Sequence, residues 1–364
     1  MSFKDLELNM GPQHPSTHGV LRLKVTIDNE VIVRIEPVVG YLHRGMEKLW
    51  ESLTYPQILP LTDRLDYIAA VSNNLAYVLA VEKLAGIEVP KRAQYIRVIL
   101  SELMRISSHL AWVGFQANDI GAITVLLYGF EYREDFLDIF ETYAGGRLTI
   151  NGLRIGGVPF DLDGGLIGRI RKTLARLPKR LHEVEMLLNE NRIWKHRTQG
   201  VGCLSAEEAI EHGLTWPCLR ACGVPLDIRK DIPYSSYEDF EFDVPLSDQG
   251  DVYGRYLVRM QEIRQSVRII EQALDRLPAG DHIAKVPKIL RIPAGEVFHS
   301  IEAPKGELGF YIRSNGTDKP ERVKMKSPSF INLQSLPSMC RGGIFSDVVS
   351  ILGSLDIVLG EIDK

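Results

Sequence analysis

Two histidines lie close together in 11-GPQHPSTHGV-20, a stretch that also holds prolines and hydroxyl side chains. The imidazoles of His14 and His18 are suited to binding a metal or transferring a proton, because histidine titrates near neutral pH. The same composition is typical of a turn, in which a histidine caps backbone carbonyls and does no chemistry. The stretch therefore raises three hypotheses, a metal, a proton or a plain turn, and its composition leaves all three open.

A second group of polar residues interrupts the apolar pattern of 62-TDRLDYIAA-70. The group consists of Asp63, Arg64, Asp66 and Tyr67. A carboxylate inside an apolar region needs a partner or becomes protonated, and a tyrosine supplies a neutral hydrogen-bond donor. Pairing of the aspartates with Arg64, together with a core tyrosine whose hydroxyl is satisfied, would explain the same residues without a catalytic role.

A third candidate is Asp119 in 116-QANDIGA-122, at the apolar end of a long amphipathic stretch. A histidine, a tyrosine and a carboxylate at one cavity would bind a ligand that carries carbonyl groups and deliver protons to it. His18, Tyr67 and Asp119 supply these three groups. An aspartate before Ile-Gly is equally typical of a turn cap, so spacing alone does not decide between the two interpretations.

Several familiar sites are missing from the sequence. It has no G-x-G-x-x-G after a predicted strand, no G-x-x-x-x-G-K-[ST] and no G-x-S-x-G, which disfavours a self-contained nucleotide-binding enzyme. The cysteines are Cys203, Cys218, Cys222 and Cys340. Only one pair is close, at a C-x3-C spacing, and it lacks the second pair that a zinc or iron–sulfur site needs. We therefore expect inert thiols in a reducing compartment and no bound metal.

Charge and hydropathy restrict the partners. The formal net charge is −4, which disfavours nucleic acid, since phosphate recognition usually requires a basic excess. The opening residues form no apolar signal, and the longest apolar run, 122–130, is far shorter than the about 20 residues of a membrane span. We expect no membrane span within the chain, while docking onto a membrane partner remains possible.

The hydrophobic periodicity predicts an α+β protein. Alternation predicts a β-hairpin at 21–36 with its turn at Asp28-Asn29. Helical spacing predicts helices at 56–84, about 91–115, roughly 131–143, 165–192, 251–276 and about 342–353. Pro90 precedes the second of these helices, and Pro178 is expected to bend or break the fourth. The capping box Ser205-x-x-Glu208 predicts one further short helix. In the helix at 91–115, an apolar stripe is predicted to be buried, with Arg97, Glu102 and Arg105 elsewhere.

The remaining segments complete the predicted architecture. Residues 223–245 are expected to form a loop or a few short strands, and 295–333 a small antiparallel sheet. We expect a single domain over 1–364, in which a central helical bundle is flanked by β structure from both ends of the chain. Its parts are an N-terminal loop and hairpin at 1–40, a helical core at 41–280 and a β-rich C-terminal part at 281–364.

Six stretches of the sequence resemble the 49-kDa (D) subunit of respiratory NADH:quinone oxidoreductase, complex I. They are 11-GPQHPSTHGVLRL-23, 40-GYLHRGMEK-48, 62-TDRLDY-67, 118-NDIGA-122, 249-QGDVYGRYLVRMQEIRQS-266 and 302-EAPKGELGFYIRSNGTDKPERVKMKSPSF-330. The resemblance covers essentially the whole chain, from Met10 to Lys364.

That family resembles the large subunit of nickel–iron hydrogenases, which binds its metals through two C-x-x-C pairs, one near each end of the chain. The corresponding places here are 63-DRLDY-67 and 354-SLDIVLGEIDK-364, and neither contains a cysteine. The resemblance therefore implies a hydrogenase-like fold without nickel or iron. It also implies that the vacated pocket receives the head group of a quinone.

The resemblance further implies roles for particular residues. His18 matches the histidine at one quinone carbonyl, Tyr67 matches the tyrosine at the other, and Asp119 matches the aspartate that pairs with this histidine. Arg44 matches an arginine near the terminal iron–sulfur cluster, which a neighbouring subunit holds. His14 is expected only to shape its loop.

Thr149 departs from the family pattern, because many members carry a histidine at this position. That histidine makes the potential of the neighbouring cluster depend on pH. Threonine does not titrate, so we expect a weaker pH dependence or none. This departure favours a quinone of low potential, such as menaquinone.

Taken as a member of this family, the chain is expected to be a catalytic-core subunit of a proton-translocating NADH:quinone oxidoreductase that is active only in the complex. The expected substrate is quinone, and the chain itself binds no cofactor, since NADH, FMN and the iron–sulfur clusters bind to partners. Those partners would be an iron–sulfur subunit with the terminal cluster, a 30-kDa-type subunit, a ferredoxin-like subunit and a membrane subunit with the quinone channel. The chain would then lie peripherally on the cytoplasmic side of the cell (inner) membrane. The alternatives are the equivalent subunit of a ferredoxin-dependent enzyme and, against the missing cysteines, a hydrogenase-type large subunit.

Overall fold

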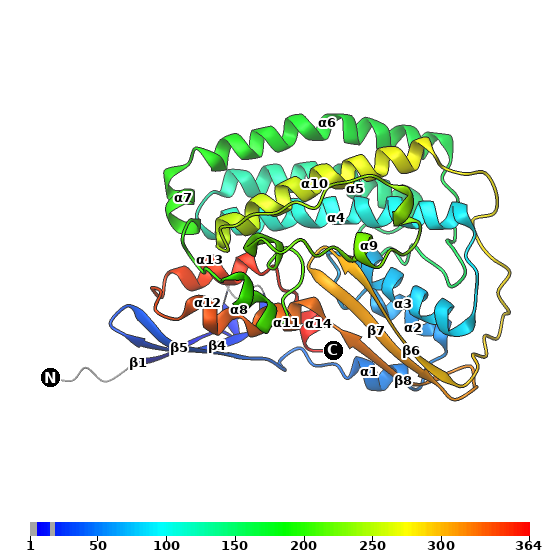
Figure 1. Ribbon diagram of the computed structural model, residues 1–364, viewed down its shortest axis with the longest axis horizontal. Coiled ribbons are helices and arrows are strands. Elements are labelled where there is room, and N and C mark those ends of the chain that lie inside the picture. The colour runs from blue at the N-terminus through cyan, green and yellow to red at the C-terminus, as the bar shows by residue number, and fades with distance from the viewer. Residues whose placement is uncertain (1–5, 15–18) are drawn as a thin grey trace.

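A computed structural model describes residues 6–14 and 19–364 of the chain (Figure 1). The strands are β1 (Leu6–Met10), β2 (Gln13–His14), β3 (Gly19–Val20), β4 (Arg22–Asp28), β5 (Val31–Val38), β6 (Gly295–Ala303), β7 (Gly306–Ser314) and β8 (Pro320–Lys326). The longer helices are α2 (Tyr55–Thr62), α3 (Ala70–Ala85), α4 (Lys91–Asp119), α5 (Ile123–Ala144), α6 (Gly164–Asn189), α10 (Val252–Asp275) and α13 (Asp347–Ser354). The shorter ones are α1 (Met46–Trp50), α7 (Arg192–Thr198), α8 (Ala206–Glu211), η2 (Arg220–Cys222), α9 (Ile228–Asp231), η3 (Tyr237–Asp239), α11 (Pro328–Gln334), α12 (Leu336–Cys340) and α14 (Leu359–Ile362).

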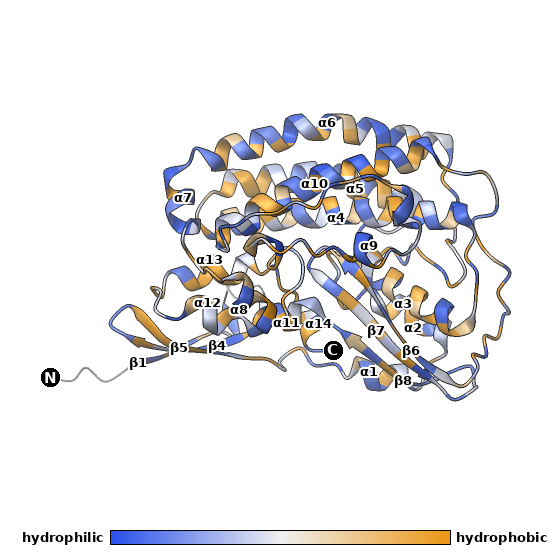
Figure 2. Cartoon of the chain, in the orientation of Figure 1, coloured by the Kyte–Doolittle hydropathy of each residue, from blue (hydrophilic) through white to orange (hydrophobic). Residues whose placement is uncertain are grey.

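Helices α4, α5, α6 and α10 form one layer of the molecule (Figure 1). Within it, α4 packs against α5 and α10, and α6 covers α5 and α10. The outer helix is α6, and hydrophilic and hydrophobic residues alternate along it at helical spacing (Figure 2). This pattern gives the helix one apolar face that packs on the layer below. Its apolar stripe runs from Leu166 to Leu188 and is buried, and Asp163 caps its first turn by accepting from the Leu166 N–H. Pro178 lies inside this helix, which continues through it.

Helix α4 lies at the centre of the layer and is buried on nearly every side. The prediction that Arg97, Glu102 and Arg105 lie away from the buried stripe is wrong, because all three are buried. Each finds an oppositely charged partner inside the protein, which offsets the cost of removing its charge from water.

The first sheet has the strand order β1-β4-β5 and is antiparallel throughout. The hairpin predicted at 21–36 is confirmed, with Asn29 in a left-handed conformation at its turn. Its inward side chains, among them Leu23 and Val25, share a core with residues of α12 and α13. The two ends of the chain are therefore packed together.

The second sheet has the order β6-β7-β8, as predicted for 295–333, and α3 packs against β6 and β7. The predicted α+β architecture is thus confirmed, with a helical core between N-terminal strands and a small C-terminal sheet (Figure 1). In the described part of the chain, the structure shows no helix that is long and apolar enough to cross a membrane.

Several predicted boundaries are corrected. The single helix predicted at 56–84 is two helices, α2 and α3, separated by residues 63–69. Helix α4 runs on to Asp119, and α5 begins at Ile123, several residues before the predicted start. The stretch 223–245 contains short helical turns in a loop, and the capping box at Ser205 and Glu208 is confirmed.

Candidate functional site

The break between α2 and α3 carries the polar group that the sequence singled out. The Asp66 carboxylate turns back onto its own chain, where Oδ1 accepts hydrogen bonds from the N–H groups of Ile68 at 3.0 Å and Ala69 at 3.3 Å. Tyr67 lies between them, and its side chain is 48% exposed. The buried carboxylate thus fixes the backbone next to a partly exposed phenol.

A lysine from the other end of the chain approaches the same carboxylate. The Nζ of Lys305 lies 3.2 Å from Oδ2 of Asp66 and 3.5 Å from Oδ2 of Asp356, and the lysine is 1% exposed. Burial alone would lower the pKa of Lys305, but the carboxylates of Asp356, Asp66 and Glu361 outweigh burial and raise it. Lys305 is therefore a permanent buried cation.

The lysine joins two segments that lie about 290 residues apart in sequence and side by side in space. A Cβ added to Gly360 would lie only 2.6 Å from the Leu65 carbonyl oxygen, so the backbones are in direct contact. Arg44 stabilises this contact, because its Nη2 donates to the carbonyls of Gly360 at 2.9 Å and Arg64 at 3.2 Å. Segments 63–67 and 354–361 therefore form one site.

Glu361 adds a further buried carboxyl group to this site. Its Oε1 accepts from the Ser329 N–H at 2.9 Å. Burial and the Asp66 carboxylate raise the pKa of Glu361, the Ser329 hydrogen bonds and Lys305 lower it, and the net result is a pKa of about 7. The site thus holds a carboxyl group that can exchange a proton near neutral pH.

The predicted histidine loop is only partly described. His18 lies outside the described residues, so its role stays a prediction. His14 is exposed in β2, where it pairs with Gly19 of β3. A Cβ on Gly19 would lie 2.9 Å from Cδ1 of Leu359, so this backbone rests directly on the 354–361 segment.

Asp119 is the last residue of α4 and is half-buried. Ser108 of the same helix accepts from Lys305 Nζ at 3.4 Å, and the helical rise places Asp119 about 16 Å further along the axis. This end of α4 is fixed to α13, since Trp112 donates to the Gly353 carbonyl and Gln116 donates to the Ser350 carbonyl. Asp119 therefore lies about 16 Å along α4 from the helix turn that contacts Lys305.

The segments of Arg44 and Thr149 contact the 63–67 break at different residues. Arg44 is exposed and precedes α1, and Thr149 is half-buried in the loop after α5. Asp63 reaches this loop, because its Oδ2 accepts from the Asn151 N–H at 2.8 Å. The structure thus brings the Arg44 and Thr149 segments to the backbone that carries Tyr67.

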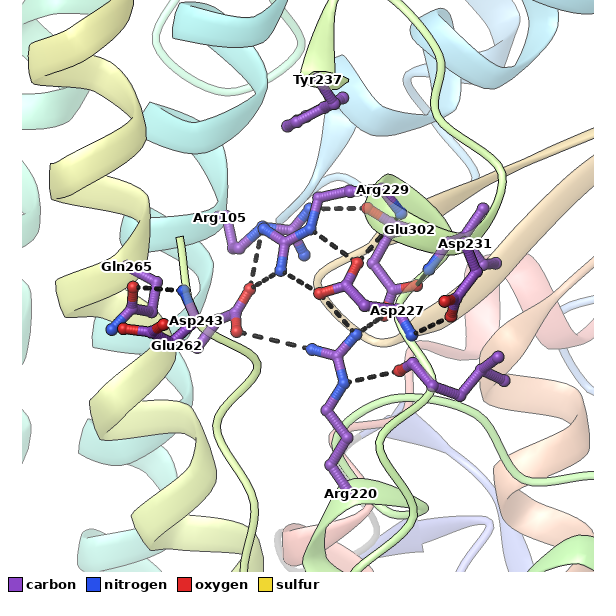
Figure 3. A network of polar contacts seen from close by, with 12 residues as sticks. Arg105, Arg220, Asp227, Arg229, Asp231, Tyr237, Asp243, Glu262, Gln265 and Glu302 are labelled. Carbon is purple, nitrogen blue, oxygen red and sulfur yellow. Dashed lines mark hydrogen bonds and ion pairs between the residues drawn. The ribbon is translucent and has the colours of Figure 1, made fainter. Parts of the chain in front are cut away.

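A fully buried ionic network adjoins the site, and sequence reasoning did not foresee it (Figure 3). Its members are Glu102, Arg105, Arg220, Asp227, Arg229, Glu262 and Glu302. Glu302 lies near the end of β6 and Lys305 in the following turn, so one hairpin supplies a charge to the network and another to the site. Burial raises the pKa of Glu302 to about 7, which the neighbouring Asp227 carboxylate favours and Arg220 opposes.

Within residues 6–14 and 19–364, no group of three or more His, Cys, Asp or Glu side chains could hold a metal ion. The position between the two converging segments is taken by the ammonium of Lys305. The lysine in the predicted turn 304–306 is the sequence signal for this role. The neighbouring residues give no sign that this turn is buried.

Comparison with known proteins shows the family of the chain. The family model described as "Respiratory-chain NADH dehydrogenase, 49 Kd subunit" matches residues 119–291 and 285–364. The chain is 53% identical over 360 residues to a D-type component of the NADH-quinone oxidoreductase of Solibacter usitatus, with 99% of this chain and 97% of the relative covered. It is 54% identical over 358 residues to the D-type component of the NADH-quinone oxidoreductase of Dehalococcoides mccartyi, with 98% of each covered. The chain therefore belongs to the family of the 49-kDa subunit of the respiratory-chain NADH dehydrogenase.

Proposed function

We propose that this chain forms one wall of the quinone site in a proton-translocating NADH:quinone oxidoreductase. The observation that carries the proposal is the buried Lys305–Asp66 ion pair directly behind the exposed Tyr67. The ion pair fixes the backbone of a phenol that faces outward, and its cation fills the position between the two segments where the hydrogenase relative would hold metal.

The reaction needs two electrons and two protons for each quinone reduced to quinol. The electrons come from an iron–sulfur cluster in a partner subunit, because this chain carries no redox group of its own in the proposal. Tyr67 transfers its hydroxyl proton to one carbonyl oxygen of the quinone, and His18 transfers a proton to the other. Both groups regain a proton from solvent afterwards, and Asp119 stabilises the protonated form of His18.

The position of Gly19 supports a role for its neighbour His18. Gly19 rests on Leu359, and the next residue, Gly360, packs on the backbone at Leu65, two residues before Tyr67. The chain therefore leaves the histidine loop at the edge of the Tyr67 site. A quinone ring held between the two side chains would have a hydrogen-bond donor at each carbonyl.

Coupling to proton translocation would begin at the His18–Asp119 pair. When the histidine gives up its proton, the charge of Asp119 loses its compensation, and a charge change of this kind can bias a distant conformational change. Asp119→Asn removes that charge, so we expect fewer protons translocated per electron in membrane vesicles. An unchanged ratio would rule out this part of the proposal.

The placement of the chain follows from the lipid-soluble substrate. We propose that the chain docks peripherally on the cytoplasmic side of the cell membrane, where a membrane-embedded partner supplies the quinone. The other proposed partners are the iron–sulfur subunit with the terminal cluster, a 30-kDa-type subunit and a ferredoxin-like subunit. NADH and FMN would bind elsewhere in the complex.

Tyr67→Phe tests the proposed function in the assembled complex. The change removes one hydroxyl from a side chain that is 48% exposed, so assembly should be retained. Loss of a positioned proton donor should lower quinone reduction by about 100-fold or more, while electron transfer from NADH to ferricyanide stays unchanged. Tyr128→Phe, at another exposed tyrosine, is the control. Normal quinone turnover in Tyr67→Phe would refute the proposal.

A further inference from the structure

Asp63 is a buried carboxylate that the chemistry above does not use. It follows the last residue of α2 and is 1% exposed. Its two oxygens serve two different segments, since Oδ1 accepts from the side-chain amide of Asn74 and Oδ2 accepts from the main-chain N–H of Asn151 at 2.8 Å. A carboxylate with both oxygens engaged in this way ties distant parts of the chain together.

On one side, Asp63 holds the tip of the loop between α5 and α6. Asn151 has a φ of 42°, in the left-handed region that residues other than glycine rarely adopt. Its N–H is held by Asp63, and its carbonyl accepts from Nη1 of Arg154 at 2.8 Å. Thr149 lies two residues before this held position.

The base of the same loop is fixed by other residues. Glu82 accepts from the Gly156 N–H at 2.6 Å, and Arg97 donates to the carbonyl of Gly157 at 3.2 Å. These contacts do not involve Asp63. Its contribution is therefore confined to the tip of the loop around Asn151, which makes the effect of Asp63 separable from the stability of the loop as a whole.

On the other side, Asp63 belongs to the backbone that leads to Tyr67. Asn74 of α3, which donates to Asp63, also donates to Oγ1 of Thr62 at 2.9 Å. The next residue, Arg64, has its carbonyl held by Arg44. Asp63 is thus fixed to both helices at the break that carries the tyrosine.

We propose that Asp63 is a positioning residue that holds the Thr149–Asn151 loop tip against the Tyr67 break. This inference rests on the proposed function, in which the loop tip faces the partner's cluster and Tyr67 faces the quinone. The clamp then keeps the electron donor and the quinone at a fixed separation. Burial raises the pKa of Asp63 to about 6. Burying this carboxylate therefore costs free energy that an apolar residue at the same position would not cost.

The test uses the assembled complex with Asp63→Ala and Asp63→Asn, and with Asp161→Ala as the control. Asp161 is an exposed residue near the far end of the same loop, where it pairs with Arg92. Asp63→Asn keeps the shape but has only one acceptor oxygen for two donors. Deuterium exchange of the 148–152 and 154–157 amides is measured together with KM and kcat for a short-chain quinone.

In Asp63→Ala, exchange at 148–152 should rise at least 10-fold while exchange at 154–157 is unchanged, and the quinone KM should rise at least 5-fold. Asp63→Asn should show smaller changes in the same direction, and Asp161→Ala should match the wild-type protein. If Asp63→Ala does not assemble, Asn74→Ser removes the other donor to Asp63 and should give a smaller rise at 148–152.

Unchanged exchange at 148–152 in the assembled variant would overturn the inference. Raised exchange with unchanged KM and kcat would also overturn it, because the clamp would then have no role in positioning. Tyr67→Phe, measured in parallel, separates this failure from failure of the proposed function. Normal turnover in Tyr67→Phe would refute the quinone role of the tyrosine, whereas the clamp is judged by the amide exchange, KM and kcat of the Asp63 variants.

Discussion

The ammonium of Lys305 lies 3.2 Å from a carboxylate oxygen of Asp66, and the next residue in the chain is Tyr67. The same ammonium is 3.5 Å from Asp356, in the segment that packs on the other side of the break. A protein cation thus joins segments 63–67 and 354–361. The position of Tyr67 depends on this ion pair, since the other oxygen of Asp66 caps the backbone just after the tyrosine.

The first prediction concerns the charge at Lys305. Lys305→Met would leave Asp66 and Asp356 buried without their cation, and breaking a buried ion pair in this way costs about 3–5 kcal/mol. We expect the assembled complex to lose this subunit at a lower temperature and to lose quinone turnover. Thermal dissociation followed on native gels measures the first effect.

Two further variants separate charge from side-chain length. Lys305→Arg keeps the charge and should retain most of the stability, although its planar group fits the site less well. Lys324→Met removes an exposed lysine on β8 and should change nothing. If Lys305→Met melted like Lys324→Met, the ion pair would have no part in holding the site.

The second prediction concerns Thr149, which is half-buried in the loop held by Asp63. Threonine has no titrating group, so the potential of the partner's terminal cluster should vary little between pH 6 and pH 8. Thr149→His should introduce a slope that approaches about 59 mV per pH unit around the pKa of the histidine. Redox titrations monitored by electron paramagnetic resonance would show it. A steep slope in the unaltered complex would contradict this assignment.

The third prediction concerns a proton on Glu302. The ionic network has four carboxyl groups and three guanidinium groups, so one carboxyl group lacks a full positive partner. Burial, with the Asp227 carboxylate, raises the pKa of Glu302 from its ordinary 4.5 to about 7. Because the folded protein binds this proton more tightly, the stabilisation is complete below about pH 4.5 and is lost as the pH rises through about 7.

Infrared spectroscopy would detect this proton as the carbonyl stretch of a protonated carboxylic acid. The band should be present at pH 6, fall by pH 8 and lose the contribution of Glu302 in Glu302→Gln. The pKa of Glu361 is also raised to about 7, so Glu361→Gln identifies the part of the band that belongs to Glu361. A pH 6 spectrum that is the same in the wild-type protein and Glu302→Gln would show that the proton resides elsewhere.

Local patterns in the sequence predicted much of the fold. The hairpin, the C-terminal sheet and the capping box at Ser205 depend on residues that are neighbours in the chain, so alternation and spacing are sufficient. The break at 63–69 was missed because the apolar spacing continues through it, while the capping by Asp66 and its pairing with Lys305 interrupt the helix.

The site was less predictable than the fold for a related reason. Tyr67 was singled out from its polar surroundings in the sequence and Arg44 through resemblance, and in the structure the Arg44 guanidinium donates to the Arg64 carbonyl, three residues before Tyr67. The role of Lys305 depends on a contact with a residue 239 positions away, which periodicity does not report. The burial of Arg97, Glu102 and Arg105 was missed because charged side chains are usually exposed, and their partners lie in distant segments.

A structure of the assembled complex with its quinone bound is the sharpest test of the proposed site. We predict that one carbonyl oxygen of the head group lies within about 3.2 Å of the Tyr67 hydroxyl and that the other lies within the same distance of the His18 imidazole. A head group bound away from Tyr67, or a metal ion between segments 63–67 and 354–361 in place of the Lys305 ammonium, would contradict this prediction.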